Sequence, residues 1–395
     1  MDWKQRKLGD ISEKVTEKNK DKKFTETFTN SAEYGIVPQN DFFDKVISNS
    51  KNISNYYIVQ NDDFIYNPRI SNFAPVGPIK RNKLNKVGVM SPLYYVFRTK
   101  NIDLTFLEKF FDTSYWHRFM KLNGDTGARA DRFAIKDSVF KEMPVPYPSS
   151  DEQTKIGNLL KQIDRTIALH QRKLEQLREL KKAALQYLFP QQDKKEPKVR
   201  FTSFNEIWEQ RKLNEVSEKV RRKNKNKKFT ETFTNSAEYG IISQNEFFDK
   251  KISNAKNIGN YYIVHQDDFV YNPRISFFAP VGPIKRNNLN RSGIMSPLYY
   301  VFRPKNIDLT FLEKFFDTNY WYKFMKLNGD TGARADRFSI KDSVFEEMPI
   351  PYPDEQEQFK IGNLLKRLDE INDLNQQKLE ELQNFKKAFL QKMFI

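Results

Sequence analysis

The residues best suited to chemistry in this sequence lie in a polar, glycine-rich segment that occurs twice. The first copy, Asn123–Arg132, reads N-G-D-T-G-A-R-A-D-R, and Asn328–Arg337 repeats it unchanged. Arginine can bind a guanine edge or a phosphate through two hydrogen bonds, and lysine mostly engages phosphate. An exposed loop of this kind can enter a DNA groove. The segment therefore indicates binding to DNA, with Arg129 and Arg132 as its strongest candidates.

Further residues that could contact DNA recur at matching positions. In the first copy the candidates are Arg69, Lys80, Arg81, Lys121, Asn123, Thr126, Arg129 and Arg132. In the second copy they are Arg274, Lys285, Arg286, Lys326, Asn328, Thr331, Arg334 and Arg337. For any single residue of this kind a solvated or salt-bridged surface role is the commoner one, and Arg69 could equally hold a structural carboxylate. The clusters are a better indication of DNA binding than their members.

Motifs for catalysis are missing from the sequence. Asn67–Ile70 reads N-P-R-I, which differs in its third residue from the N-P-P-[YF] loop of amino-methyltransferases, and no glycine-rich cofactor strand precedes it. Gly124–Gly127 lacks the Lys-Ser/Thr of a phosphate-cradling loop. The chain has no cysteine and three histidines, and its carboxylates form no recurring metal-binding pattern. We therefore expect no enzyme and no catalytic, metal or cofactor-binding residues.

The charge of the chain points to a polyanionic partner. The formal net charge is +16 and the pI is about 9.5, which favours nucleic acid before a membrane because no basic amphipathic helix stands out. A merely basic surface is the alternative. No run of eighteen apolar residues is present, and Met1–Lys4 does not resemble a signal peptide. We expect a cytoplasmic protein with no membrane contact.

The whole chain is a tandem duplication. Trp3 recurs as Trp208 and Ile156 as Ile361, both 205 positions later, so no net insertion separates the copies. A repeat this long exceeds a solenoid unit, and a chain of 395 residues has room for about two domains. The sequence therefore predicts two homologous modules.

Each module reads as a mixed α/β domain followed by a long helix. Tyr56–Val59, Phe64–Tyr66 and Leu93–Phe97 are short, rich in aromatic and β-branched residues, and predict strands. Asp103–Leu122 has apolar residues at helical spacing, with Asp103 as a plausible N-cap. Met143–Pro148 must be extended because proline occupies alternate positions.

The long helices carry the four-and-three apolar spacing of a coiled coil. Seam residues of the first helix are Ile156, Leu160, Ile163, Ile167, Leu174, Leu177, Ala184 and Leu188. A capping box, Ser149 with Glu152, marks its start, and Asp354 with Glu357 repeats the spacing. We predict globular domains at 1–148 and 208–353, spacer helices at 149–189 and 354–395, and a linker at 190–207.

Linker length predicts the orientation of the helices. A helix of roughly 38 residues is about 57 Å long. Parallel pairing would require the linker of roughly 18 residues to return that full length, which is nearly its limit. We therefore expect an antiparallel two-helix coiled coil that joins the two domains with an approximate two-fold axis.

Five segments match, in their order, those of a known family: Trp3–Gly9, Trp208–Leu213, Thr126–Arg132, Met143–Pro146 and Glu152–Gly157. With these motifs the chain resembles the DNA specificity subunit of type I restriction-modification systems. The resemblance covers nearly all of the sequence, and such subunits have two target recognition domains separated by two helical regions that pair antiparallel. In family members a segment like Lys198–Phe204 usually precedes each module, so the resemblance implies a shortened N-terminus.

What the resemblance implies is a non-catalytic subunit that binds double-stranded DNA and docks two modification subunits. Those partners use S-adenosylmethionine to methylate adenine, and restriction subunits that join them use ATP and magnesium. These cofactors would belong to the partners. An enzyme acting on DNA in its own right is one alternative, and a coiled-coil scaffold whose basic domains hold another protein is a second. The missing cofactor motifs count against the first, and the duplicated arginine loops against the second.

The near identity of the two domains predicts a near-palindromic, bipartite target. Family members commonly carry two different domains, whereas here Lys22–Ile36 returns unchanged as Lys227–Ile241. Half-sites one helical turn apart, about 10 base pairs, would leave a spacer of about 5 to 7. Asn72 becomes Phe277 in the loop that carries the first arginine, and asparagine can hydrogen-bond adenine where phenylalanine only packs. One base could therefore differ between the half-sites.

Overall fold

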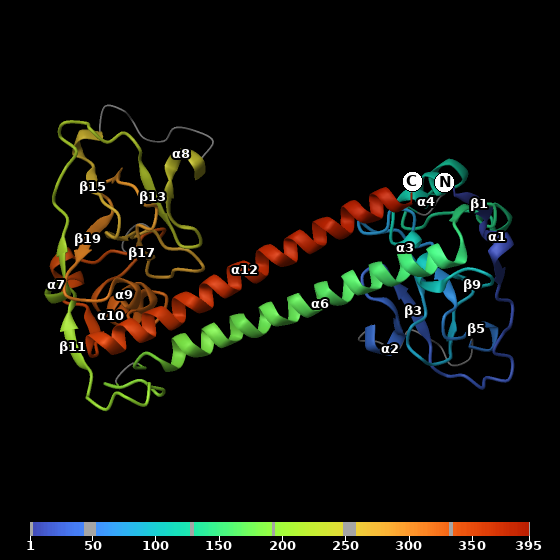
Figure 1. Cartoon of the computed structure of the whole chain (residues 1–395), viewed down its shortest axis with the longest axis horizontal. Coiled ribbons are helices and arrows are strands. Elements are labelled where there is room, and N and C mark those ends of the chain that lie inside the picture. The colour runs from blue at the N-terminus through green and yellow to red at the C-terminus, as the bar shows by residue number, and fades with distance from the viewer. Residues whose placement is uncertain are drawn as a thin grey trace. The chain divides into compact units, whose positions relative to one another are not determined.

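The computed structural model describes residues 3–42, 53–126, 130–191, 194–247, 258–331 and 335–394, and Figure 1 labels its helices and strands. The chain divides into two compact units. The first consists of Met1–Gln171 with Gln377–Ile395, and the second is Arg172–Gln376. Each unit therefore contains one globular domain, part of its own long helix, and part of the long helix that follows the other domain.

The two domains have the same elements in the same order, which confirms the mixed helix and strand class and the duplication. The strands of the first are β1 Lys4–Lys7, β2 Ser12–Lys14, β3 Phe28–Ser31, β4 Gly35–Pro38, β5 Tyr57–Val59, β6 Phe64–Tyr66, β7 Ile79–Arg81, β8 Gly88–Met90, β9 Tyr95–Thr99 and β10 Pro144–Tyr147. Its short helices are α1 Leu8–Ile11, α2 Gln39–Phe42, η1 Ile53–Asn55, α3 Leu104–Phe111, α4 Tyr115–Asn123 and α5 Asp137–Phe140.

The second domain repeats this list. Its strands are β11 Glu209–Lys212, β12 Ser217–Lys219, β13 Phe233–Ser236, β14 Gly240–Ser243, β15 Tyr262–Val264, β16 Phe269–Tyr271, β17 Ile284–Arg286, β18 Gly293–Met295, β19 Tyr300–Pro304 and β20 Pro349–Tyr352. Its short helices are α7 Leu213–Val216, α8 Gln244–Phe247, η2 Ile258–Asn260, α9 Leu309–Phe316, α10 Tyr322–Asn328 and α11 Asp342–Phe345. The long helices are α6 Ser150–Tyr187 and α12 Glu355–Met393.

A four-stranded antiparallel sheet in the order β2-β9-β6-β7 forms the centre of the first domain, and β12-β19-β16-β17 matches it in the second. Side chains alternate between its faces, as strand geometry requires. Phe64 and Tyr66 of β6 join the larger core with Phe106 of α3, whereas Ile65 joins a smaller cluster with Phe28. The sheet is therefore buried on both faces.

The helix predicted at Asp103–Leu122 is two helices, α3 and α4, so that prediction is wrong in its length. Asp103 is the N-cap, and its side chain accepts a hydrogen bond from the backbone N–H of Phe106 at 2.8 Å. The break follows Asp112, where the hydroxyl of Thr113 donates to the carbonyl of Phe110 at 2.7 Å. Threonine competes in this way for the backbone acceptors that would continue a helix.

In the first unit, the start of α6 lies beside the end of α12. The indole Nε1 of Trp3 donates to Glu152 at 3.1 Å, and the Trp3 ring lies 6.3 Å from that of Phe394. Further along α6, Asp164 pairs with Lys386 at 2.6 Å. Residue numbers fall along α12 as they rise along α6, so the helices are antiparallel in this unit.

The second unit has the same antiparallel pairing. Arg178 donates to the side-chain oxygen of Gln376 at 3.3 Å, and one turn later Lys181 pairs with Asp369. The long helices in Figure 1, α6 in green and α12 in red, are thus antiparallel within each unit, as predicted. The two-fold axis between the copies stays a prediction.

The capping box predicted at the start of each long helix is half present. The Ser149 hydroxyl accepts from the backbone N–H of Glu152 at 3.3 Å, but the Glu152 carboxylate binds the Trp3 indole instead of closing the box. Glu357 similarly accepts from Trp208 at 2.9 Å. These glutamates therefore fasten the first strand of each domain to its helix. No helix in the described part of the chain has the length and apolar character needed to cross a bilayer.

Candidate nucleic-acid interface

Two of the predicted arginines meet across the surface of the first domain. The backbones of Arg69 and Arg132 form an isolated antiparallel bridge. On either side, the N–H of Ile70 donates to the carbonyl of Asp131 at 3.0 Å, and the N–H of Phe133 donates to that of Pro68 at 2.8 Å. The loop between β6 and β7 is thereby tied to the segment that follows α4, and two residues far apart in sequence become neighbours.

Both guanidinium groups of this pair are free within the described ranges. Arg69 is exposed and Arg132 is half-buried. Among the residues that the structure describes, neither side chain has an ion pair or hydrogen bond. Two neighbouring cations without a counterion repel each other, and an anion placed between them removes that repulsion. The structural role considered for Arg69, holding a carboxylate, therefore has no partner among the described residues.

A groove of about 480 Å³ opens beside the Arg69–Arg132 pair. Its floor is made by Asn30 of β3, whose side-chain N–H group donates to the carbonyls of Ile65 at 2.7 Å and Pro78 at 3.2 Å. Asn67 donates to the Asn30 carbonyl and accepts from the N–H of Arg69 at 2.9 Å. Buried amides thus fix the backbone from which the first arginine projects.

The second domain builds the same arrangement. Arg274 and Arg337 face each other across a bridge, with hydrogen bonds of 3.1 Å from Ile275 to Asp336 and 2.8 Å from Phe338 to Pro273 on either side. Arg274 is exposed, Arg337 is half-buried, and neither has a side-chain partner in the described part of the chain. The duplication therefore preserves the free arginine pair as well as the fold.

Four of the predicted cations lie elsewhere and are neutralised. They belong to β7 and β17, at the edge of each central sheet, where α3, α9 and the aspartates that cap the ends of these helices supply carboxylates. The ion pairs are Lys80–Asp112 at 3.1 Å, Arg81–Glu108 at 3.0 Å, Lys285–Asp317 at 2.9 Å and Arg286–Glu313 at 3.4 Å. Arg286 also pairs with Asp267, at 2.5 Å. This geometry gives Lys80, Arg81, Lys285 and Arg286 a role in holding helix to sheet.

The remaining candidates lie in the last turns of α4 and α10 or directly after these helices. Lys121, Thr126, Lys326 and Thr331 are exposed. Asn123 and Asn328 each close the last turn of a helix, donating at 2.8 Å to the carbonyls of Phe119 and Phe324. Arg129, which the sequence indicated together with Arg132 as a strongest candidate, and its copy Arg334 lie outside the described residues.

A network of charges joins each domain to the helix pair. In the first unit Lys109 of α3 donates to Asp112 at 3.0 Å and to Asp164 of α6 at 2.6 Å, and Lys386 completes the chain. Burial alone would raise the pKa of Asp112, but the ammonium groups of Lys109 and Lys80 outweigh it and hold the pKa below its usual range. Sequence reasoning missed this network because its members lie on four different elements.

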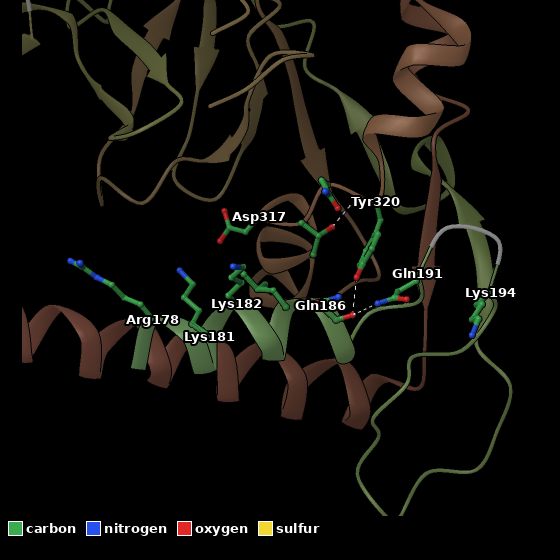
Figure 2. Close-up of a pocket in the computed structure, with 11 residues that line it drawn as sticks. Arg178, Lys181, Lys182, Gln186, Gln191, Lys194, Asp317 and Tyr320 are labelled. Atoms are coloured by element: carbon green, nitrogen blue, oxygen red, sulfur yellow. Dashed lines mark hydrogen bonds between the residues drawn. The ribbon is translucent and has the colours of Figure 1, made fainter. Parts of the chain in front are cut away.

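Figure 2 shows a basic hollow of about 870 Å³ in the second unit, between the end of α6 and the α9–α10 turn. Arg178, Lys181, Lys182 and Lys194 line it together with Asp317. Lys181 pairs with Asp369, and Asp317 with Lys285, so part of this charge is already neutralised. Across the hollow the Tyr320 hydroxyl donates to the carbonyl of Gln186 at 2.8 Å, which joins the domain to the helix end.

The described residues contain no group of three or more histidines or acids arranged to hold a metal ion. Apolar side chains are exposed beside the arginine pairs, and sequence reasoning named one of them, Phe277, but missed the others. Tyr34, Phe73 and Leu93 are largely exposed there, as are Tyr239, Phe277, Phe278 and Leu298 in the second domain. An aromatic residue in a short loop rich in proline and without acids was the available signal.

Comparison with protein families matches residues 1–179 and 205–384 to the type I restriction modification DNA specificity domain. A relative from Methanocaldococcus jannaschii, the type I restriction enzyme MjaVIII specificity subunit, is 23% identical over 324 residues, 78% of this chain and 73% of the relative. Two crystal structures share the fold. The HsdS subunit from Thermoanaerobacter tengcongensis is 14% identical, with a TM-score of 0.51 over 99% of this chain and 96% of that one. The type I restriction-modification S subunit from M. genitalium is 15% identical, with a TM-score of 0.55 over 100% and 96%.

Proposed function

Because this chain belongs to the type I restriction modification DNA specificity family, we propose that each of its domains reads one half of a split DNA target through its free arginine pair. Membership makes the chain the DNA-recognition component of such a system and not its catalyst. An independent DNA-acting enzyme and a protein-binding scaffold are therefore not favoured. The sequence analysis predicted a DNA-recognition subunit from the basic charge, the duplicated arginine loops and the family resemblance, and the family match confirms that subunit role.

The bridge between Arg69 and Arg132 is the observation that carries the proposal for the site. A guanidinium can bind the O6 and N7 atoms of guanine or two oxygens of a phosphate through parallel hydrogen bonds. Two such groups on adjacent backbone can engage a base edge and a neighbouring phosphate together. Their unpaired state favours an anionic ligand, because no described carboxylate has to be displaced first.

The target is a near-palindrome in this proposal. Arg274 and Arg337 reproduce the first pair in bridge, exposure and lack of partners. Two alike readers carried on antiparallel helices would read alike sequences in opposite directions, separated by a fixed spacer. The two half-sites therefore have the same core of base pairs.

Partner subunits complete the activity. We propose two modification subunits that use S-adenosylmethionine to methylate adenine, and restriction subunits that use ATP and magnesium. The helices support docking, because Leu169 of α6 is 67% exposed, Leu180 is 52% exposed and Leu374 of α12 is 64% exposed. A subunit docked on the helices would remove the apolar surface of these side chains from water, which stabilises the complex.

Methylation-site sequencing tests the proposal. The full chain, produced with its modification subunits, is compared with Arg132→Ala and Arg337→Ala. We expect each variant to weaken specific binding by about 1 to 3 kcal/mol and to lose or relax one half of the methylated motif. Arg291→Ala is the control: it removes one positive charge at an arginine that already pairs with Glu231, and it should leave the methylated motif unchanged. Normal methylation by both pair variants would contradict the site.

A further inference from the structure

Among the residues that the structure describes, the most exposed aromatic side chains lie on the loops that carry the free arginines. Phe73 is 81% exposed, Phe277 is 94% exposed and Phe278 is 71% exposed. A phenylalanine in water gains nothing from folding, and its apolar surface is stabilised only when a partner covers it. These three residues therefore indicate a surface that contacts another molecule.

The loop presents its tip on a fixed backbone. Ser71 and Ala74 exchange two backbone hydrogen bonds of 3.1 Å, and Ala74 is buried. Gly77 closes the loop at φ +83, and a Cβ there would lie 2.1 Å from the carbonyl oxygen of Asn67. Phe73 therefore sits at the tip of a short, anchored turn, and its exposure does not reflect a loosely held segment.

The second domain has a larger apolar tip on the same turn. Ser276 and Ala279 exchange the matching hydrogen bonds of 3.1 Å. Between them, the rings of Phe277 and Phe278 pack edge to face, with centroids 5.4 Å apart and planes at 85°. The pair forms one apolar wedge where the first domain has a single phenylalanine beside Asn72.

Charge around the tips selects the partner. The segment Asn67–Pro78 contains one charged residue, Arg69, and no acid, and its copy Asn272–Pro283 is the same in this respect. Free guanidinium groups at the base of an apolar tip fit a partner that is anionic outside and apolar inside. Duplex DNA has this character, with phosphates at the rim of each groove and base faces and methyl groups within.

We propose that Phe73 in one domain, and Phe277 with Phe278 in the other, contact DNA bases, and that position 72 or 277 sets the difference between the half-sites. This inference rests on the proposed DNA-reading role of the arginine pairs. A phenylalanine ring makes an apolar contact with a base in two ways: it packs on the 5-methyl group of thymine, or it wedges between two base pairs and unstacks them.

The duplication supplies a matched experiment. The described segments beside the arginine pair, 31–35, 67–74, 121–126 and 130–132, differ from their copies at one position, Asn72 against Phe277. Phe277→Asn makes the two faces identical in sequence, and Asn72→Phe does so in the opposite sense. Each change removes or adds a side chain at an exposed position, so folding should be unaffected, which thermal unfolding checks.

The test uses the full chain produced with its modification subunits, and the methylated motif is read by sequencing. We expect Phe277→Asn to change one half-site so that the motif becomes a perfect palindrome, and Asn72→Phe to change the other half-site. Phe73→Ala and Phe278→Ala should weaken binding to the cognate duplex at least fivefold. Unchanged motifs for both exchanges, together with unchanged binding by the alanine variants, overturn the inference.

Two DNA probes then identify the contact. Deoxyuridine in place of thymidine weakens binding if a ring packs on the methyl group, and 2-aminopurine beside the contacted step brightens if a ring unstacks it. The Arg132→Ala and Arg337→Ala variants separate this inference from the proposed function. If the arginine variants lose methylation and the phenylalanine variants have no effect, the proposed contact of the phenylalanines with bases is wrong while the arginine site stands. If neither set of variants has an effect, both the phenylalanine contact and the arginine site are wrong.

Discussion

The Nζ atom of Lys109 lies 2.6 Å from a carboxylate oxygen of Asp164, and this contact joins the first domain to α6. Lys314 makes the matching contact with Asp369 of α12 at 2.7 Å. Each lysine side chain is less than 10% exposed and also binds an aspartate on its own domain. A reader can discriminate bases only if it is held firmly, so these buried lysines are positioning residues for the arginine faces.

Removing Lys109 should destabilise the first unit. Lys109→Ala leaves Asp112, whose side chain is 24% exposed, with Lys80 as its remaining ion-pair partner, whereas breaking a fully buried ion pair costs about 3 to 5 kcal/mol. We expect a loss of about 2 to 4 kcal/mol in the free energy of unfolding, because Asp164 is 31% exposed and retains Lys386. Urea unfolding measures it. Lys83→Ala removes an exposed lysine from Glu108, which keeps its pair with Arg81, and should change stability by less than about 1 kcal/mol. Equal losses for the two variants would contradict the positioning role.

Stability should fall in acid through these same aspartates. Burial opposes ionisation of Asp164, but hydrogen bonds and charge from Lys109 and Lys386 prevail and lower its pKa below its ordinary value. A carboxyl whose pKa is lower in the folded state stabilises that state above its unfolded value, and this contribution is lost as pH falls through the folded value. The melting temperature should therefore drop below about pH 4. The Asp164→Asn variant should have a lower melting temperature than the unaltered chain at neutral pH, and its melting temperature should fall less steeply in acid. Parallel plots of melting temperature against pH would show that Asp164 does not cause the acid loss.

The two glutamates at the helix starts should differ in importance. Glu357 is buried, accepts from Trp208 at 2.9 Å and pairs with Arg200 through two hydrogen bonds of 2.9 and 2.8 Å. Glu152 accepts from Trp3 at 3.1 Å. Glu357→Ala leaves a nearly buried guanidinium without its main partner and should cost about 3 kcal/mol or more, against about 1 kcal/mol for Glu152→Ala. Chemical unfolding measures the free energy of unfolding of both variants. A larger loss for Glu152→Ala than for Glu357→Ala would contradict this prediction.

DNA binding should depend steeply on salt. Each neutralised phosphate releases counterions, so the logarithm of the association constant falls with the logarithm of salt concentration by about 0.9 per contact. Arg132→Ala should reduce that slope by about 1 if Arg132 contacts a phosphate, and should leave it unchanged while weakening binding if Arg132 reads a base. Titrations at several salt concentrations separate the two roles. A flat salt response of the unaltered chain would contradict the proposed interface.

Interrupting the helix pair should disturb assembly. Leu174 lies on the seam of α6 and is 5% exposed. Leu174→Pro removes a helical hydrogen bond and introduces a clash, at a cost of about 3 kcal/mol or more. Co-purification with the modification subunits measures the consequence, with Leu174→Ala as a control that keeps the helix. Full assembly by the proline variant would argue that the helices do not form the dock.

Local patterns allowed much of the fold to be predicted. The four-and-three spacing that includes Ile156 and Leu160 identified a long helix, and the constant offset of Trp3 and Trp208 identified the duplication. The break after Asp112 was not predicted, because apolar spacing continues across it while a threonine hydroxyl takes a backbone acceptor. The spacing of apolar residues indicates which face of a helix is buried, but it does not reveal a side-chain hydroxyl that competes for a backbone acceptor.

The candidate site was predicted in composition but not in arrangement. Arg69 and Arg132 were both named, yet nothing local indicates that their backbones pair, because that register depends on how two distant loops fold over the same sheet. Lys80 and Arg81 looked equivalent to them in sequence, and the carboxylates that neutralise both come from α3. Whether a surface cation is free is a tertiary property.

Sequencing of methylated DNA from cells that carry the complete system tests the central claim most directly. The account predicts one split motif whose half-sites read alike on opposite strands, with at most a single base of difference and a fixed spacer. Inserting two base pairs into that spacer should abolish methylation, since it rotates one half-site by about 70°. Two unrelated half-sites, or a motif that survives both Arg132→Ala and Arg337→Ala unchanged, would contradict it.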